Sequence, residues 1–214
     1  MIRAYDKIYL EKARTALGRM LDFAVYDLKY DINFFFRMFI TSGVAARFEI
    51  GDCSLLAGMS GVEIAYEVLE NSGVNVERIK PNYTANRSRE YWMGWALSYY
   101  QWETSLHFSE IVKYIPVEEI LALYTPYHEM DIRQFCDKMD EMYKAAKPET
   151  NLKLFRQNAG LSQRELSKLS GVPVRTIQQY EQRQKNINKA QAEYLIMLSD
   201  VLCCEVIDLM EKVQ

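Results

Sequence analysis

The sequence predicts an all-α protein with an N-terminal multi-helix domain and a smaller C-terminal domain of five helices. Apolar residues recur at the spacing of one helix face in almost every segment. Residues that cap helices precede several of these segments, and glycines follow them. Lys147-Pro148-Glu149 interrupts the pattern, and proline disfavours helical backbone in the residue before it. We therefore expect an all-helical domain at 1–147 and a second domain at 150–214.

The N-terminal helices are predicted from this periodicity together with signals at their ends. Asp31 is expected to cap the second helix, and Ser42-Gly43 to end it. Pro116 is expected in the first turn of a later helix. An aromatic-rich helix at 88–102 is expected at the centre of the core. The other expected helical segments are 5–28, 31–40, 45–49, 62–71, 108–114, 116–124 and 131–146, with turns at 51–61 and a loop at 73–87.

Residues 151–183, NLKLFRQNAGLSQRELSKLSGVPVRTIQQYEQR, contain the pattern of three short helices. The first is expected to end at Gly160. Ser162 and Glu165 form a capping box that begins the second, and Gly171 ends it, because glycine enters a left-handed turn without strain. Pro173 lies in the turn before a third helix at 174–182. The side chains expected to face the core are Leu152, Leu154, Phe155, Leu166, Leu169, Ile177 and Tyr180.

The third helix has a polar outer face, on which Arg175 and Gln179 lie one turn apart. Two short helices joined by a glycine turn form the motif that enters the major groove of double-stranded DNA. Arginine pairs there with guanine, and glutamine pairs with adenine. Backbone amides beside Gln163 suit a phosphate. Arg183, Lys185 and Asn186 follow the third helix and are expected to hold the DNA backbone. The residues expected to contact DNA are Gln163, Val174, Arg175, Gln178, Gln179, Arg183, Lys185 and Asn186.

The segment LSQRELSKLSGVPVRTIQQYEQ resembles the helix-turn-helix of the phage repressor and Cro superfamily, the XRE family of bacterial regulators. The resemblance covers about residues 150–212 and implies a five-helix, repressor-like fold. It also implies that Gln163, Val174, Arg175, Gln178 and Gln179 occupy the DNA-facing positions of that family. The chain departs from the family at Pro173-Val174, where many members carry polar residues, so a thymine methyl is the expected contact of Val174. It also lacks the glycine common in the loop at 182–186.

The charge distribution agrees with a DNA-binding module joined to an acidic partner domain. Residues 150–214 hold nine basic against seven acidic side chains, a balance of +2, whereas residues 1–149 hold seventeen against twenty-two, a balance of −5.

No run of eighteen apolar residues occurs, and the first residues lack the apolar centre of a secretory signal. We therefore expect a cytoplasmic protein with no membrane partner.

The sequence shows no pattern typical of a metal site or of catalysis. The cysteines, Cys53, Cys136, Cys203 and Cys204, have no CxxC spacing, and His107 and His128 show no ligand spacing with them. No Ser/His/Asp or Cys/His signature, phosphate-binding glycine loop or HExxH motif occurs. The expectation is a protein that is not an enzyme and has no catalytic residue, no metal and no cofactor.

Three interpretations of the N-terminal domain stay open. It is an interaction or dimerisation domain, since repressors of this kind bind two half-sites as homodimers. It is an antitoxin domain that binds a toxin protein, because GMSGVEIAYEVLENSG and SREYWMGWALSYYQWETSLHFSEI are similar to uncharacterised Firmicutes antitoxin-like regulators. Or it is the sensor of a small-molecule-responsive repressor, with a pocket walled by aromatic residues that are more often core. Those residues are Tyr91, Trp92, Trp95, Tyr99, Tyr100 and Trp102.

Overall fold

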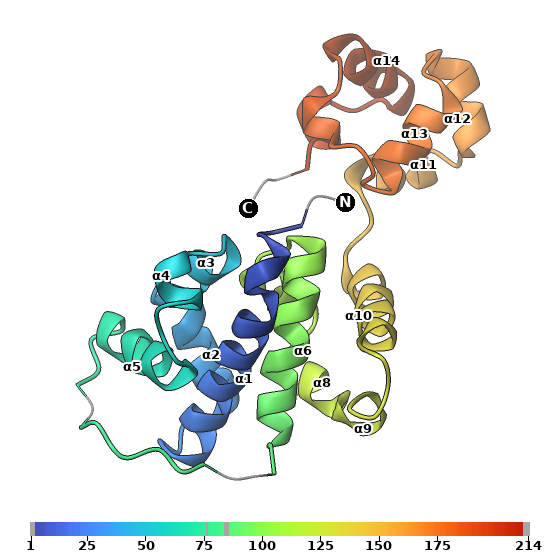
Figure 1. The fold of residues 1–214 in the computed structure, drawn as a ribbon. Helices are drawn as coiled ribbons and strands as arrows, with labels where there is room; N and C mark the ends of the chain where they lie inside the picture. Colours follow the sequence, from blue (N-terminus) through green and yellow to red (C-terminus); the bar gives the residue numbers. More distant parts are fainter. Residues whose placement is uncertain (1–2, 76, 84–85, 212–214) are drawn as a thin grey trace. The chain divides into compact units, whose positions relative to one another are not determined.

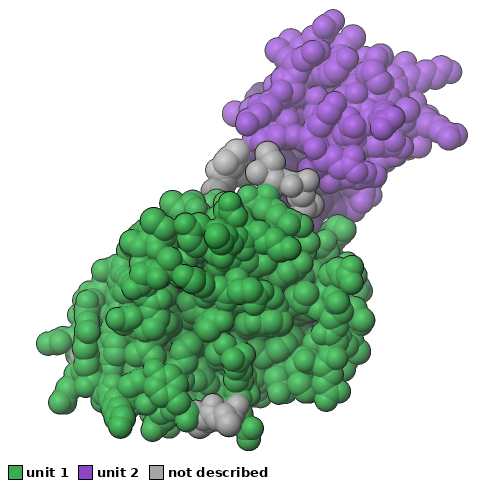
Figure 2. Space-filling model, in the orientation of Figure 1, with its two compact units in different colours: residues 1–146 green, residues 147–214 purple. Residues whose placement is uncertain are grey.

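The computed structural model describes residues 3–75, 77–83 and 86–211. Every regular element in these described residues is a helix (Figure 1), which confirms the all-α prediction. The chain divides into two compact units, residues 1–146 (unit 1) and 147–214 (unit 2), which are coloured separately in Figure 2. None of the helices in the described residues is long and apolar enough to cross a membrane.

Unit 1 begins with the 3-10 helix η1 (Lys7–Tyr9) and continues with ten α-helices in its described residues. They are α1 (Leu10–Tyr26), α2 (Ile32–Thr41), α3 (Val44–Glu49), α4 (Cys53–Leu56), α5 (Gly61–Asn71), α6 (Arg89–Thr104), α7 (Phe108–Tyr114), α8 (Val117–Ala122), α9 (Tyr124–Tyr127) and α10 (Ile132–Ala146).

The helix ends of unit 1 follow local side-chain chemistry. The Asp31 carboxylate accepts two backbone N–H groups at the start of α2, and Ser88 caps α6 by accepting from the Tyr91 amide. Two details of the prediction are wrong. The expected turn region 51–61 contains α4, which Asp52 caps. The expected helix 116–124 ends at Ala122 and α9 follows, and Pro116 precedes its first turn as the N-cap.

Helices α1 and α6 lie side by side at the centre of unit 1 (Figure 1). Their backbones approach closely at Gly18 and Gly94, because a Cβ atom built on Gly94 would lie 2.7 Å from the Leu17 carbonyl oxygen. Four phenylalanine rings, those of Phe36, Phe39, Phe48 and Phe108, pack against one another in the same core.

The aromatic residues of α6 serve mainly as core. Tyr100 and Trp102 are buried, and the Trp102 indole N–H donates to the Tyr5 carbonyl at 2.8 Å. Trp95 is half-buried, and the Arg14 guanidinium covers its ring at 3.3 Å from the centroid. These rings therefore stabilise the packing of α6 in unit 1.

Unit 2 contains five α-helices and one 3-10 helix in its described residues. They are α11 (Asn151–Asn158), α12 (Gln163–Ser170), α13 (Val174–Glu181), η2 (Ile187–Lys189), α14 (Ala192–Leu202) and α15 (Val206–Leu209). Its core is formed by Leu152, Leu166, Val172, Ile177, Tyr180, Ile187, Leu195, Leu198, Leu202 and Leu209.

Two leucines expected in the core of unit 2 are exposed, so their prediction is wrong. Leu154 is 42% exposed and Leu169 is 61% exposed. On α12 the buried stripe runs from Leu166 to Ser170, one turn later, and Val172 beyond the turn supplies the next core side chain. Leu169 therefore lies outside the stripe, although its spacing from Leu166 suits a helix face.

Candidate nucleic-acid interface

The turn between α12 and α13 is fixed by local hydrogen bonds. Ser162 Oγ accepts from the Glu165 amide at 3.2 Å, and Glu165 Oε2 accepts from the Ser162 amide at 2.8 Å, which confirms the capping box. Gly171 ends α12 at φ +73°, in the left-handed region. The Ser167 hydroxyl donates to the Val172 carbonyl at 2.7 Å, which ties α12 to the turn. These contacts set the angle at which α13 leaves the turn.

Helix α13 has one buried and one open face. Ile177 and Tyr180 are buried, as predicted. Arg175 is exposed, and Val174, Gln178 and Gln179 are half-buried. Among the four residues of α13 that were expected to contact DNA, Arg175 is therefore fully open, and Val174, Gln178 and Gln179 are partly open.

A buried ion pair joins α13 to α11. Arg156 Nε donates to Glu181 Oε1 at 2.6 Å, and Arg156 Nη2 donates to Glu181 Oε2 at 2.9 Å. Arg156 Nη1 also donates to the Leu161 carbonyl at 2.7 Å. The hydrogen bond with Glu181 raises the pKa of the Arg156 guanidinium. A bidentate pair of this kind holds the end of α13 in a single orientation.

Gln163 connects this ion pair to the outer face of α13. Its Nε2 donates to Glu181 Oε2 at 2.7 Å, and its Oε1 accepts from Gln178 Nε2 at 3.4 Å. The structure thus brings together Gln163 and Gln178, two residues that were expected to contact DNA separately. The Gln178 amide consequently has a preferred orientation.

Three side chains of the loop after α13 were expected to bind DNA phosphates. Two of them, Arg183 and Asn186, form hydrogen bonds with other residues of unit 2. Arg183 adopts φ +54° where a glycine is lacking, and its Nε donates to Glu211 Oε2 at 2.8 Å. Asn186 caps η2 by accepting from the Asn188 amide at 2.9 Å. Lys185 is exposed, and its backbone N–H donates to the Gln179 carbonyl at 3.1 Å.

Three residues of these networks, Arg156, Glu181 and Glu211, were not predicted from the sequence, because their partners lie far away in the chain. A signal for the first pair existed, because Arg156 follows Phe155 on the apolar face of α11, and a charged residue there needs a partner. No comparable local signal marked Glu211.

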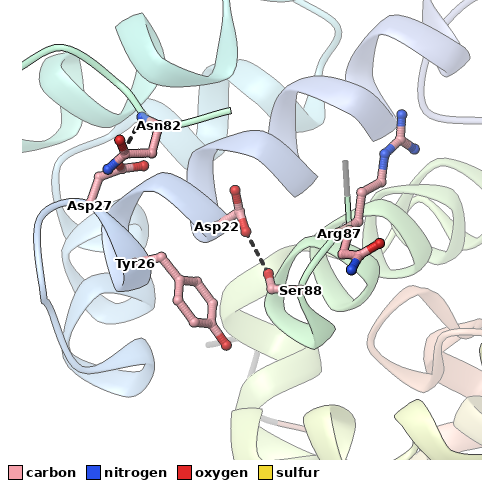
Figure 3. A pocket seen from close by; sticks show the side chains of 7 residues that line it. Asp22, Tyr26, Asp27, Asn82, Arg87 and Ser88 are labelled. Carbon is pink, nitrogen blue, oxygen red and sulfur yellow. Dashed lines mark hydrogen bonds between the residues drawn. The ribbon is translucent and has the colours of Figure 1, made fainter. Parts of the chain in front are cut away.

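Unit 1 has an open pocket of about 650 Å³ between the end of α1 and the segment before α6 (Figure 3). The Ser88 hydroxyl donates to Asp22 at 2.6 Å, and Asp27 accepts from the backbone and side-chain amides of Asn82 at 2.9 and 2.8 Å. None of the aromatic residues proposed as pocket walls lines it. The lining residues are Asp22, Tyr26, Asp27, Asn82, Asn86, Arg87 and Ser88.

In the described part of the chain, no three His, Cys, Asp or Glu side chains are grouped so that they could hold a metal ion.

Comparison with known proteins agrees with the geometry of unit 2. A helix-turn-helix family model matches residues 152–202, which reach from α11 to the end of α14. No curated protein matches the chain, and no solved structure matches it. Unit 2 is therefore a helix-turn-helix domain, the class of fold that places a helix in the DNA major groove. The match to residues 152–202 is of the XRE type of helix-turn-helix, as the sequence resemblance indicated.

Proposed function

We propose that the chain is a sequence-specific transcriptional regulator that reads double-stranded DNA with α13. The observation that carries the proposal is the open polar face of α13, which its buried residues and the Arg156–Glu181 pair hold in place. A helix anchored in this way presents its side chains to base edges without first becoming ordered. The chain is proposed to act by binding and not by catalysis, in the cytoplasm of a bacterium.

The side chains on this face have the chemistry of direct base readout. The exposed Arg175 suits the two acceptors of guanine, and Val174 suits a thymine methyl. Gln178 uses one N–H toward Gln163, which leaves its carbonyl oxygen and its second N–H for an adenine. Gln163 thus acts as a positioning residue for Gln178.

We infer further that the regulator binds as a homodimer and represses a promoter. A single helix of this length reaches few base pairs, and two half-sites one helical turn apart multiply the affinity. Unit 1 is the proposed dimerisation domain. Sedimentation of the full chain with and without an operator duplex tests this step, and a monomer on a single half-site would exclude it.

The pocket of unit 1 supports a second candidate function, a small-molecule-responsive repressor. Its lining combines hydroxyl, amide and carboxylate groups with a larger apolar surface, which suits a small effector with a polar and an apolar part. An effector that binds this pocket raises the melting temperature of the full chain, and above its Kd the rise grows with the logarithm of its concentration. Co-purification with a small protein at fixed stoichiometry, without any such rise, supports the antitoxin interpretation instead.

Replacing Arg175 with alanine is expected to cost about 1–3 kcal/mol of binding free energy on a selected operator and to relax preference at one base pair. The measurement is fluorescence anisotropy with the operator and its single-base variants, after selection of an operator by the wild-type chain. Arg133→Ala, which removes an exposed arginine of unit 1, is the matched control and leaves affinity unchanged. Equal losses on the operator and on random DNA would contradict base readout by Arg175.

Replacing Lys185 with glutamine is expected to weaken binding to every sequence alike. An exposed lysine beside the end of α13 suits a phosphate, and each phosphate contact contributes about 0.9 to the slope of log K against log salt. Titrations at several salt concentrations should therefore show a slope flatter by about 0.9. An unchanged slope removes Lys185 from the phosphate contacts.

A further inference from the structure

The segment that follows α15 returns to the loop that follows α13. The Glu211 amide donates to Asn188 Oδ1 at 2.8 Å, and Asn188 Nδ2 donates to the Glu211 carbonyl at 2.5 Å. Asn151 Nδ2 also donates to the Met210 carbonyl at 2.7 Å. The backbone of Glu211 is therefore held in place by contacts that do not involve its own side chain.

The Glu211 carboxylate is directed to Arg183, two residues beyond the end of α13. Arg183 Nε donates to Glu211 Oε2 at 2.8 Å, and the side chains are 28% and 27% exposed. An anion held at a fixed position has a high effective concentration at this guanidinium. Water still reaches the pair, so another anion can displace the carboxylate.

A DNA phosphate needs the same guanidinium. Carboxylate and phosphate oxygens both accept charge-assisted hydrogen bonds from arginine. The Glu211 carboxylate occupies the Nε–H of Arg183 and neutralises its single positive charge, which weakens the attraction of a phosphate to the remaining N–H groups. We propose that Glu211 competes with a DNA phosphate for Arg183 and thereby lowers the affinity of the regulator for DNA. The inference depends on the DNA-binding function proposed above. In this proposal, Glu211 is an intramolecular anion that competes with DNA beside the end of α13.

Glu211→Gln tests the competition in the full chain. The amide keeps the backbone contacts with Asn188 but removes the negative charge. We expect binding about three- to tenfold tighter near 0.1 M salt, on operator and random DNA alike, and a salt slope steeper by about 0.9. Glu193→Gln is the matched control, because it removes one exposed negative charge from the first turn of α14 in the same unit. It should leave the slope unchanged.

Arg183→Gln provides a second test of the competition between Glu211 and a DNA phosphate. This change removes the guanidinium for which the two anions compete, so a gain that depends on Arg183 should disappear in its background. The double variant Arg183→Gln/Glu211→Gln should show no gain over Arg183→Gln alone. A gain in the double variant as large as that of Glu211→Gln alone, or an unchanged slope in Glu211→Gln, would overturn the competition. A wild-type chain that binds no duplex would instead refute the proposed function itself.

Discussion

Glu181→Ala is expected to lower the free energy of unfolding of unit 2 by about 3–5 kcal/mol, because it leaves the buried Arg156 guanidinium without its bidentate partner. Gln163 loses an acceptor in the same variant. A domain of this size is stable by only about 5 kcal/mol, so unit 2 should retain about 0–2 kcal/mol, and from about 3% to about half of it should be unfolded at room temperature. DNA binding should weaken, because α13 is no longer held by the ion pair.

The measurement is urea or thermal unfolding of the full chain followed by circular dichroism, with anisotropy for DNA. Glu149→Gln is the control, since it breaks the Lys153–Glu149 pair on the surface of the same unit and should change stability little. The double variant Arg156→Met/Glu181→Leu replaces both charges with apolar side chains and should recover most of the stability. A Glu181→Ala chain that melts like the wild type would show that the ion pair does not hold α13.

The parts of the fold that the sequence predicts well are those with local causes. Asp31 lies within three residues of the amides that it caps, and the Ser162–Glu165 box closes over three residues. The turn at Gly171 likewise depends on one backbone conformation. These features can therefore be predicted from a few neighbouring residues, without any knowledge of the tertiary packing.

The features that could not be predicted from the sequence depend on contacts between residues that are far apart in the chain. Glu181 lies 25 positions from Arg156, and Glu211 lies 28 positions from Arg183. Leu169 has the spacing of a core residue, yet Leu166 and Val172 are the buried apolar residues of this region, and that choice depends on the tertiary packing of unit 2. The outer face of α13 was predictable, whereas the network that orients it was not.

The close approach of α1 and α6 leads to the second large effect. In Gly94→Ala the new Cβ would meet the Leu17 carbonyl oxygen at 2.7 Å and the Gly18 backbone at 2.9 Å. These are backbone atoms of a central helix, so the clash is relieved only if the helices separate. We expect unit 1 to lose about 3 kcal/mol and its thermal transition to fall by about 5–15 °C. Calorimetry of the full chain provides the measurement.

The sign of the change is diagnostic, because alanine in place of an unobstructed helical glycine raises stability by about 0.5–1 kcal/mol. Gly43→Ala is the matched control: its φ is +80° and no atom lies within 4 Å of the added Cβ, so only backbone strain of about 1–2 kcal/mol opposes it. Gly94→Ala should therefore destabilise unit 1 more than Gly43→Ala. If Gly94→Ala is instead more stable than the wild type, α1 and α6 can separate at this crossing without loss of packing, and the glycine contact does not hold unit 1 together.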